Sequence, residues 1–311
     1  MLQRIIVPLD GSPFAEHALP TAYGLARRHG AQVELVMVQD APLPVARPGG
    51  APVRDPELDR ELRREARRYL DVLLGRIDAG DRARSATMLL DGPIVETLAS
   101  HASASAADLL VMTTHARGGL SRAWLGSVAD GVVRRSAVPV LLVRPVEPTG
   151  GHPGEAAFRH VLLPLDGSTA GELVIRRAID VAGADGVQFT LLRVLAPEDS
   201  ATRALLPRRG EQPSTRAQRA TVEALLESQA EGLRSRGLVA RTQTLVHDSA
   251  AACILEYAKA SGADLVAMST RSRGGVERLV LGSVADKVLR GSDRPLLLLN
   301  PTEAETGPGA R

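Results

Sequence analysis

Blocks of hydrophobic and polar residues alternate along the chain, and each block predicts one strand or one helix. Short apolar runs such as 4–9 and 33–38 are typical of buried strands. The segment 55–77 instead predicts an amphipathic helix, with Asp55 as a possible cap and Pro56 in the first turn. One apolar stripe is expected along this helix, formed by Leu58, Leu62, Ala66, Tyr69, Leu73 and Ile77.

The same pattern continues to residue 143 as a regular alternation of strands and helices. Further strands are predicted at 83–90, 108–112 and 138–143, and helices at 93–106 and 126–136. Strands that alternate with helices form parallel sheets covered on both faces. The predicted fold class is therefore α/β, with a doubly wound domain built on a five-stranded parallel sheet.

The whole arrangement occurs twice. The stretch "VPLDGS" at 7–12 returns as "LPLDGS" at 163–168, and "GSVADGVVRR" at 126–135 returns as "GSVADKVLRG" at 282–291, so both pairs are 156 positions apart. A constant offset indicates a tandem duplication. We expect a first domain over 1–147, a Pro- and Gly-rich linker over 148–157, a second domain over 158–301 and a flexible tail over 302–311.

Composition narrows the class of protein. Of the 311 residues, 44% are hydrophobic and only 2% aromatic, and the net charge is +2, so a packed protein is expected and a nucleic-acid partner is not. The only cysteine, Cys253, is expected to be a buried small residue. The N-terminus does not resemble a signal peptide and no apolar run is long enough to span a membrane, which predicts a cytoplasmic protein without a membrane partner.

Ligands of open α/β sheets bind beyond the carboxyl ends of the strands. Two segments of each copy fall there, and in the first copy they are "DGS" at 10–12 and "TTHARGGLSRAWLGS" at 113–127. Neither segment matches a P-loop or a dinucleotide fingerprint, and the chain contains no H-E-x-x-H metal motif and no G-x-S-x-G nucleophile motif.

The strand ending in "PLDGS", the strand "ADLLVM", the loop that follows it and the closing strand "VPVLLVRP" together resemble the universal stress protein family. The resemblance covers both copies, and it implies a tandem protein of two such domains. One branch of that family binds an adenine nucleotide, and its mark is a glycine, two residues, a second glycine, nine residues, a third glycine and then Ser or Thr. Another branch binds no nucleotide.

Each copy keeps one of these three glycines. Gly126 stands before Ser127, whereas Thr113 and Ala116 occupy the two earlier glycine positions. In the second copy Gly282 and Ser283 are present, and Ser269 and Ser272 take the earlier positions. Glycine permits a close approach of the ligand to the backbone, so the replacements raise the question of whether a nucleotide still fits.

The resemblance implies a set of nucleotide-binding positions in each copy, with basic side chains nearby. Free N–H groups at the start of the helix after the Gly-Ser pair would hold phosphate. The candidates in the first copy are Pro8, Asp10, Val38, Met112, Thr113, Ala116, Arg117, Gly126, Ser127, Val128 and Ala129. Those in the second copy are Pro164, Asp166, Val194, Met268, Ser269, Ser272, Arg273, Gly282, Ser283, Val284 and Ala285.

Simpler interpretations of these residues remain open. Ser127 and Ser283 would also serve as plain helix caps, and Asp10 and Asp166 as capping residues of an Asp-Gly-Ser turn. His115 corresponds to Arg271, which argues against a proton-transfer role shared by both copies.

Three functions follow from these patterns. The first is a stress-response regulator that binds ATP, with or without Mg²⁺, in one or both domains and is not a metabolic enzyme. The second is a module without a nucleotide, in which strands 138–143 and 294–299 pair as an intramolecular pseudo-dimer and the chain forms a homodimer. The third is an ATPase or autokinase, which the loop favours least because in the first copy it offers no acidic residue before Asp130.

Overall fold

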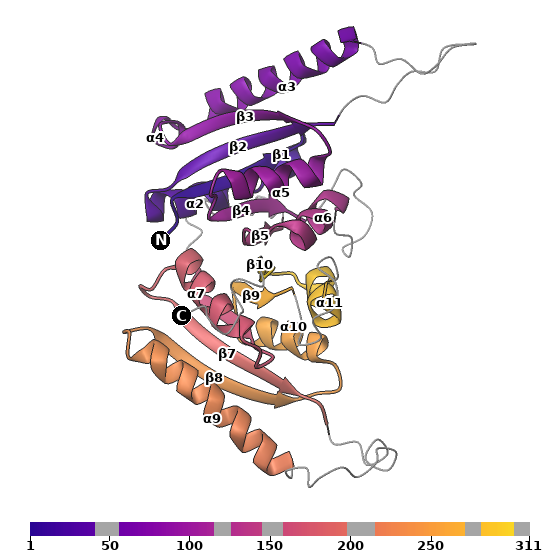
Figure 1. The fold of residues 1–311 in the computed structure, drawn as a ribbon. Helices are drawn as coiled ribbons and strands as arrows, with labels where there is room; N and C mark the ends of the chain where they lie inside the picture. The colour runs from indigo at the N-terminus through magenta and orange to yellow at the C-terminus, as the bar shows by residue number, and fades with distance from the viewer. Residues whose placement is uncertain (41–55, 115–125, 145–157, 198–214, 271–280, 302–311) are drawn as a thin grey trace, which may run out of the picture. The chain divides into compact units, whose positions relative to one another are not determined.

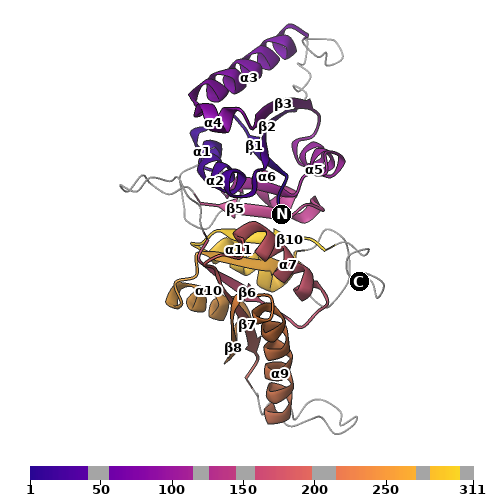
Figure 2. The ribbon, with the colours of Figure 1, turned by 90° about the vertical axis from the view of Figure 1, so that its left-hand side faces the viewer.

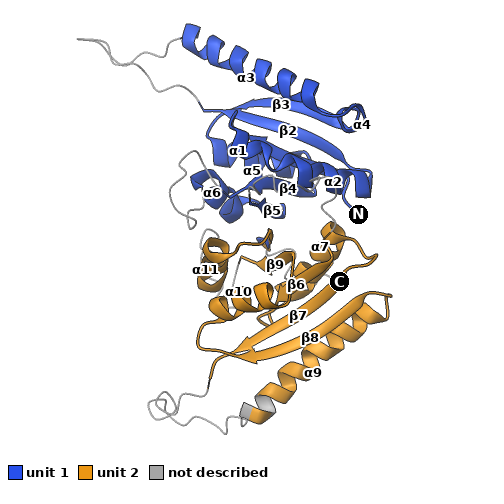
Figure 3. Ribbon diagram, turned by 180° about the vertical axis from the view of Figure 1, so that it is seen from behind, with its two compact units in different colours: residues 1–157, 298–300 blue, residues 158–297, 301–311 orange. Residues whose placement is uncertain are grey.

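The computed structural model describes residues 1–40, 56–114, 126–144, 158–197, 215–270 and 281–301. The chain divides into two compact units, coloured separately in Figure 3. Unit 1 consists of residues 1–157 with 298–300, and unit 2 of residues 158–297 with 301–311. The predicted linker and tail lie outside the described residues, and the predicted pairing of strands 138–143 and 294–299 stays a prediction.

Unit 1 contains a parallel sheet whose central strands are buried on both faces. Its strands are β1 (Arg4–Leu9), β2 (Gln32–Gln39), β3 (Ser85–Asp91), β4 (Leu109–Thr113) and β5 (Val140–Val143), in the order β3-β2-β1-β4-β5. Each neighbouring pair is parallel. Ile5, Ile6 and Val7 are consecutive and all fully buried, which is why this strand is a continuous apolar run and does not alternate.

Helices cover both faces of this sheet. They are α1 (Pro13–Glu16), α2 (Leu19–His29), α3 (Pro56–Arg76), α4 (Ala79–Arg82), α5 (Ile94–Ala104) and α6 (Ser127–Arg135). Figure 2 shows α2 and α3 on one side of the strands and α5 on the other. The strand order runs outward from β1 to β3 on one side and from β4 to β5 on the other, so it reverses between β1 and β4. The predicted doubly wound α/β architecture is therefore confirmed for unit 1.

Unit 2 repeats this architecture, as Figure 1 shows. Its strand order is β8-β7-β6-β9-β10, and the pairs β6–β7, β6–β9 and β7–β8 are parallel. Its elements are β6 (His160–Pro164), α7 (Ala170–Ala182), β7 (Gln188–Leu195), α9 (Thr215–Arg234), β8 (Val239–Val246), α10 (Ala250–Ala260), β9 (Leu265–Ser269), α11 (Ser283–Gly291) and β10 (Leu296–Leu299).

The predicted apolar stripe of α3 was wrong in its first two turns. Leu58 and Leu62 are 39% and 36% exposed, whereas Leu70, outside the predicted stripe, is buried with Ala66 and Leu73. A helix of 21 residues is about 32 Å long, whereas the 7-residue strand β3 beneath it spans about 23 Å. The helix is therefore longer than the strand that it covers. The predicted cap, Asp55, lies outside the described residues.

One aspartate in each unit fixes the start of the central strand. The backbone N–H groups of Gln3 and Arg4 both donate to Asp108 Oδ2, at 2.6 and 2.9 Å. In unit 2 the N–H groups of Arg159 and His160 donate to the two oxygens of Asp264, at 2.8 and 3.0 Å. These bonds tie β1 to β4 and β6 to β9, and the ligand crevice of this fold lies at the opposite ends of the same strand pairs.

Candidate functional site

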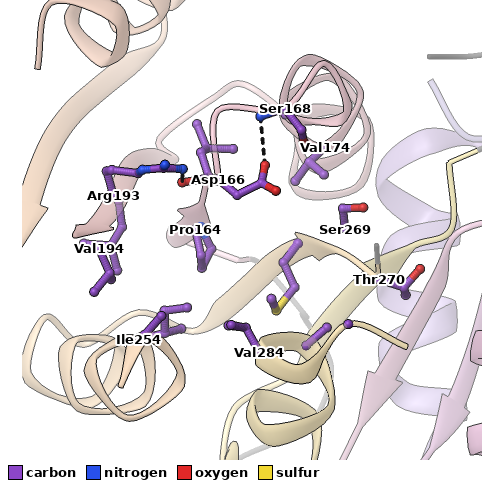
Figure 4. A pocket seen from close by; sticks show the side chains of 17 residues that line it. Pro164, Asp166, Ser168, Val174, Arg193, Val194, Ile254, Ser269, Thr270 and Val284 are labelled. Carbon is purple, nitrogen blue, oxygen red and sulfur yellow. Dashed lines mark hydrogen bonds between the residues drawn. The ribbon is translucent and has the colours of Figure 1, made fainter. Parts of the chain in front are cut away.

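A pocket of about 280 Å³ lies at the carboxyl edge of the unit 2 sheet. It opens where the strand order reverses between β6 and β9, which is the position at which this architecture binds ligands. Figure 4 shows its side chains converging from the strand ends, the turn after β6 and the helices α10 and α11. Eight predicted site residues line it, namely Pro164, Asp166, Val194, Met268, Ser269, Gly282, Val284 and Ala285.

Other predicted residues fall beside this pocket or outside the described part of the chain. Ser283 is the first residue of α11 but does not line the pocket. Ser272 and Arg273 lie outside the described residues, as do Ala116 and Arg117 of the first copy. Their predicted contacts with phosphate therefore stay predictions.

In unit 1 the corresponding residues lie at the carboxyl edge of the sheet. Pro8 and Asp10 stand at the end of β1, Val38 near the end of β2, and Met112 with Thr113 at the end of β4. Gly126, Ser127, Val128 and Ala129 begin α6. The N–H of Gly126 donates to the carbonyl of Thr114 at 2.9 Å, and that of Gly282 to Thr270 at 2.8 Å, so each helix begins directly beside its strand.

The aspartates after the first strand shape the turn that forms one wall of the crevice. The N–H of Ser168 donates to Asp166 Oδ1 at 2.9 Å, and the N–H of Ser12 donates to Asp10 Oδ1 at the same distance. The glycine between them is left-handed in both units, with φ of 79° at Gly11 and 76° at Gly167. Both aspartates thus stabilise the turn, and in unit 2 the carboxylate also lines the pocket.

Ser127 and Ser283 are not helix caps, so that simpler interpretation was wrong. The N-cap residues are Gly126 and Gly282, and no side chain of the described residues caps either helix. The first intrahelical bonds run from Asp130 N–H to the Gly126 carbonyl and from Asp286 N–H to the Gly282 carbonyl, both at 2.9 Å. The N–H groups of the three residues between cap and acid therefore have no acceptor within the helix.

The glycines at these caps do not serve an unusual backbone conformation. Gly126 has φ −62° and ψ 144°, and Gly282 has φ −60° and ψ 143°, values that any residue adopts. What glycine provides here is the absence of a side chain at the start of the helix. This is the arrangement that lets an anion approach the helix N-terminus closely.

The pocket has two chemically different ends. Figure 4 shows Ser269 and Thr270 at one end, Arg193 and Val194 at the other, and Pro164 with Asp166 between them. Ile254 and Val284 form an apolar wall. The first end adjoins the N-terminus of α11 at Gly282 and suits an anion, whereas the second end is an apolar slot with a guanidinium on its rim.

Three polar residues that line the pocket were missed by sequence reasoning. Thr270 lies between two candidate positions and matches Thr114, and this identity between the copies could have revealed it. Ser168 belongs to the repeated "DGS" and was considered only as part of the turn. Arg193 carried no signal, because it replaces Met37 of the first copy and precedes Val194, the residue that the family pattern emphasises.

A metal site and a reactive thiol find less support in the described residues. Within the described ranges, no group of three or more His, Cys, Asp or Glu side chains is placed to hold a metal ion. Cys253, on α10, is 5% exposed, as expected for a packing residue, and burial raises the pKa of its thiol.

No helix among the described residues is both long and apolar enough to cross a membrane.

Comparison with known proteins places this geometry in a family. The model of the family described as "Universal stress protein family" matches residues 1–144 and 157–300. A universal stress protein of Mycobacterium tuberculosis is 28% identical, with 94% of each chain covered. Another, from Mycolicibacterium smegmatis, is 28% identical over 201 residues, which span 62% of its own length.

Solved structures agree with the fold. A universal stress protein from Archaeoglobus fulgidus superposes with a TM-score of 0.67 over 95% of both chains, at 18% identity. A putative universal stress protein from Pseudomonas aeruginosa gives a TM-score of 0.62 at 17% identity, with 96% of this chain and 93% of the other covered. At these identities the likeness shows the architecture of the chain.

Proposed function

Because the chain belongs to the universal stress protein family, we propose that it is a stress-response regulator that binds an adenine nucleotide, ATP, in the crevice of unit 2. One observation carries this proposal: the pocket joins an apolar slot to the uncapped N-terminus of α11. A nucleotide has the same polarity, with a flat base at one end and phosphates at the other. The cytoplasm is the proposed location.

The apolar end suits a base. Leu165, the residue after β6, donates its N–H to the Leu192 carbonyl of β7 at 2.9 Å. Because backbone groups alternate along a strand, the N–H and carbonyl of Val194 point to the same edge, beyond the point where β6 ends. A peptide donor and acceptor beside an apolar wall can pair with the edge of adenine while Ile254 and Val284 contact its faces.

The other end suits phosphate. The N–H groups of Ser283, Val284 and Ala285 lack acceptors within α11, and the helix dipole adds positive potential at this point. Ser269 stands where the family pattern has its first glycine, and the pocket keeps about 280 Å³ with this side chain in its wall. The described part of the site is therefore near the lower end of the roughly 300–1,000 Å³ typical of ligand pockets.

We propose a binding protein and not a metabolic enzyme, since the acid in the first turn of α11, like that of α6, is already paired. Asp286 accepts from Arg290 at 3.0 and 3.1 Å, and Asp130 accepts from Arg134 at 2.8 and 2.9 Å. To act as a general base for water or as a ligand for Mg²⁺, Asp286 would have to break its ion pair, and Asp166, which lines the pocket, already accepts from the N–H of Ser168. Any Mg²⁺ would then be held chiefly by the phosphates.

Calorimetry with ATP and Mg²⁺ tests this proposal through a matched pair of variants. Gly282→Glu places a side chain and a negative charge at the phosphate end without backbone strain, and we expect at least about a tenfold loss of affinity. Gly126→Glu makes the same change in unit 1 and should leave the unit 2 site intact. Absence of heat in the unchanged protein would contradict nucleotide binding, and a loss only in Gly126→Glu would contradict the assignment to unit 2.

A second role rests on the final strands. β5 reads VLLV, β10 reads LLLL, and each ends the strand order of its own unit. An apolar strand at a sheet edge is a ready partner for another strand. We propose that 138–143 and 294–299 pair within the chain. Hydrogen exchange should then be slow in peptides covering both segments, whereas fast exchange in both would contradict the pairing.

A further inference from the structure

We infer that Arg193 sets which purine the unit 2 crevice accepts, and that unit 2 tolerates 6-oxopurine nucleotides such as GTP better than unit 1 does. This inference rests on the proposed nucleotide site and adds to it a residue that determines specificity. Its starting point is the replacement of Met37 in unit 1 by Arg193 in unit 2, at the same position of the duplicated strand.

Arg193 stands at the base end of the pocket. Figure 4 shows it beside Val194, on the far side of Pro164 from Ser269 and Thr270. Because Arg193 and Val194 are consecutive in β7, their side chains leave opposite faces of the sheet, and they border the slot from two directions. A cation at this end is poorly placed for phosphates held at α11, but well placed for the edge of a base.

The guanidinium is held in position by the protein. Arg193 Nη1 donates to the carbonyl of Leu165 at 2.9 Å, and Leu165 itself lines the pocket. A guanidinium carries five N–H donors in one plane, so it can keep this bond and still donate to a ligand. Holding the group in advance lowers the entropy lost when the ligand binds.

Guanine and adenine differ in the hydrogen bonds that they can form with Arg193. Guanine presents two acceptors, O6 and N7, which arginine contacts as a pair, whereas adenine presents one acceptor and the N6 amino donor on the same edge. A base turned toward Arg193 by its 6-position therefore gains from an oxo group and loses from an amino group. Met37 offers no donor, so unit 1 has no equivalent preference.

The test measures the ratio of the dissociation constants for ATP and GTP by calorimetry, in protein carrying Gly126→Glu so that only unit 2 is open. Replacing Arg193 by methionine copies unit 1, and we expect it to shift the ratio toward ATP by about tenfold. Replacing it by lysine keeps the charge but loses the planar pair of donors, so the same shift in direction is expected.

Three results would overturn the inference. The first is Arg193→Met leaving both affinities unchanged, and the second is an equal weakening of both nucleotides, which would make Arg193 a general attraction for phosphate. Lysine preserving the original ratio would show that charge alone is responsible. These results differ from failure of the proposed function, in which neither nucleotide binds the protein that keeps Arg193. Circular dichroism checks that each variant remains folded.

Discussion

The two units contain the same Asp-Gly-Ser turn but use its serine differently. In unit 1, Ser12 is 6% exposed, its hydroxyl donates to Asp10 Oδ1 at 2.5 Å, and it accepts from Ala15 N–H as the cap of α1. In unit 2, α7 begins later, at Ala170, and Ser168 lines the pocket. No hydrogen bond to the Ser168 hydroxyl occurs among the described residues.

The cause lies in the residues that follow the turn. Pro13 in unit 1 is suited to the first position of a helix, so α1 begins at once and recruits Ser12 as its cap. Unit 2 has Thr169 instead, the helix starts after it, and the serine is left at the crevice. The difference teaches that a repeated motif can be structural in one copy and available to a ligand in the other.

Substitutions in the two cores should give the largest difference between the units in the free energy of unfolding. Phe189 of β7 is fully buried and replaces Val33 of unit 1, which is also fully buried. Phe189→Ala should lower the free energy of unfolding by about 3–5 kcal/mol. Val33→Ala removes far less surface, and about 2 kcal/mol is expected. Urea unfolding followed by circular dichroism measures both, and equal losses would contradict this difference in packing.

The residue with positive φ that follows α10 in unit 2 can be compared directly with its counterpart after α5 in unit 1. Gly262 has φ 70° with no atom close to where a Cβ would stand, and the matching residue of unit 1 is Ala106, with φ 50°. Gly262→Ala should cost about 1–2 kcal/mol, and Ala106→Gly should stabilise unit 1 by about 1 kcal/mol. Thermal unfolding of both variants provides the measurement. If Ala106→Gly destabilises the protein, backbone strain is not what distinguishes these turns.

The serines of the two turns should separate stability from binding. Ser12→Ala removes a helix cap and should cost about 1 kcal/mol, with no effect on ligand binding in unit 2. Ser168→Ala should change stability by less than about 0.5 kcal/mol but weaken nucleotide binding. Urea unfolding and calorimetry on the same preparations test both halves of this statement. A stability loss in Ser168→Ala equal to that in Ser12→Ala would remove the proposed distinction.

The smallest expected effect concerns Cys253, which stands where unit 1 has Thr97. Burial raises the pKa of this thiol in the folded state, so its protonated form is favoured by folding. Its contribution to stability is complete below the pKa of the unfolded thiol and is lost as pH rises through the folded value. Between pH 8 and 10, stability should fall slightly more in the unchanged protein than in Cys253→Ala. Identical slopes in urea unfolding would contradict this.

The sequence was sufficient for the architecture because buried parallel strands are continuous apolar runs. The strand predicted at 33–38 is β2 at Gln32–Gln39, and the constant offset of 156 positions carried each element into the second copy. Short helices were harder to predict. The four residues of α4 have no periodicity, and the strand predicted from residue 83 begins only at Ser85.

Site residues that belong to a repeated sequence motif were predictable. Residues that reach the pocket only through the relative positions of strands and helices were not. Asp166 and Gly282 follow from repeated sequence patterns, and both line the pocket. Arg193 reaches the pocket only because β7 extends past the end of β6, which is a matter of strand register and not of local sequence. Ser168 depends on where the next helix begins. Such features require the positions of several elements at once.

The central claim is that the unit 2 crevice holds a nucleotide, and mass spectrometry of the small molecules released from denatured, freshly purified protein tests it most directly. The unchanged protein and Gly126→Glu should release a purine nucleotide in comparable amounts per chain, whereas Gly282→Glu should release little. No nucleotide from the unchanged protein, or equal release from Gly282→Glu, would contradict the claim.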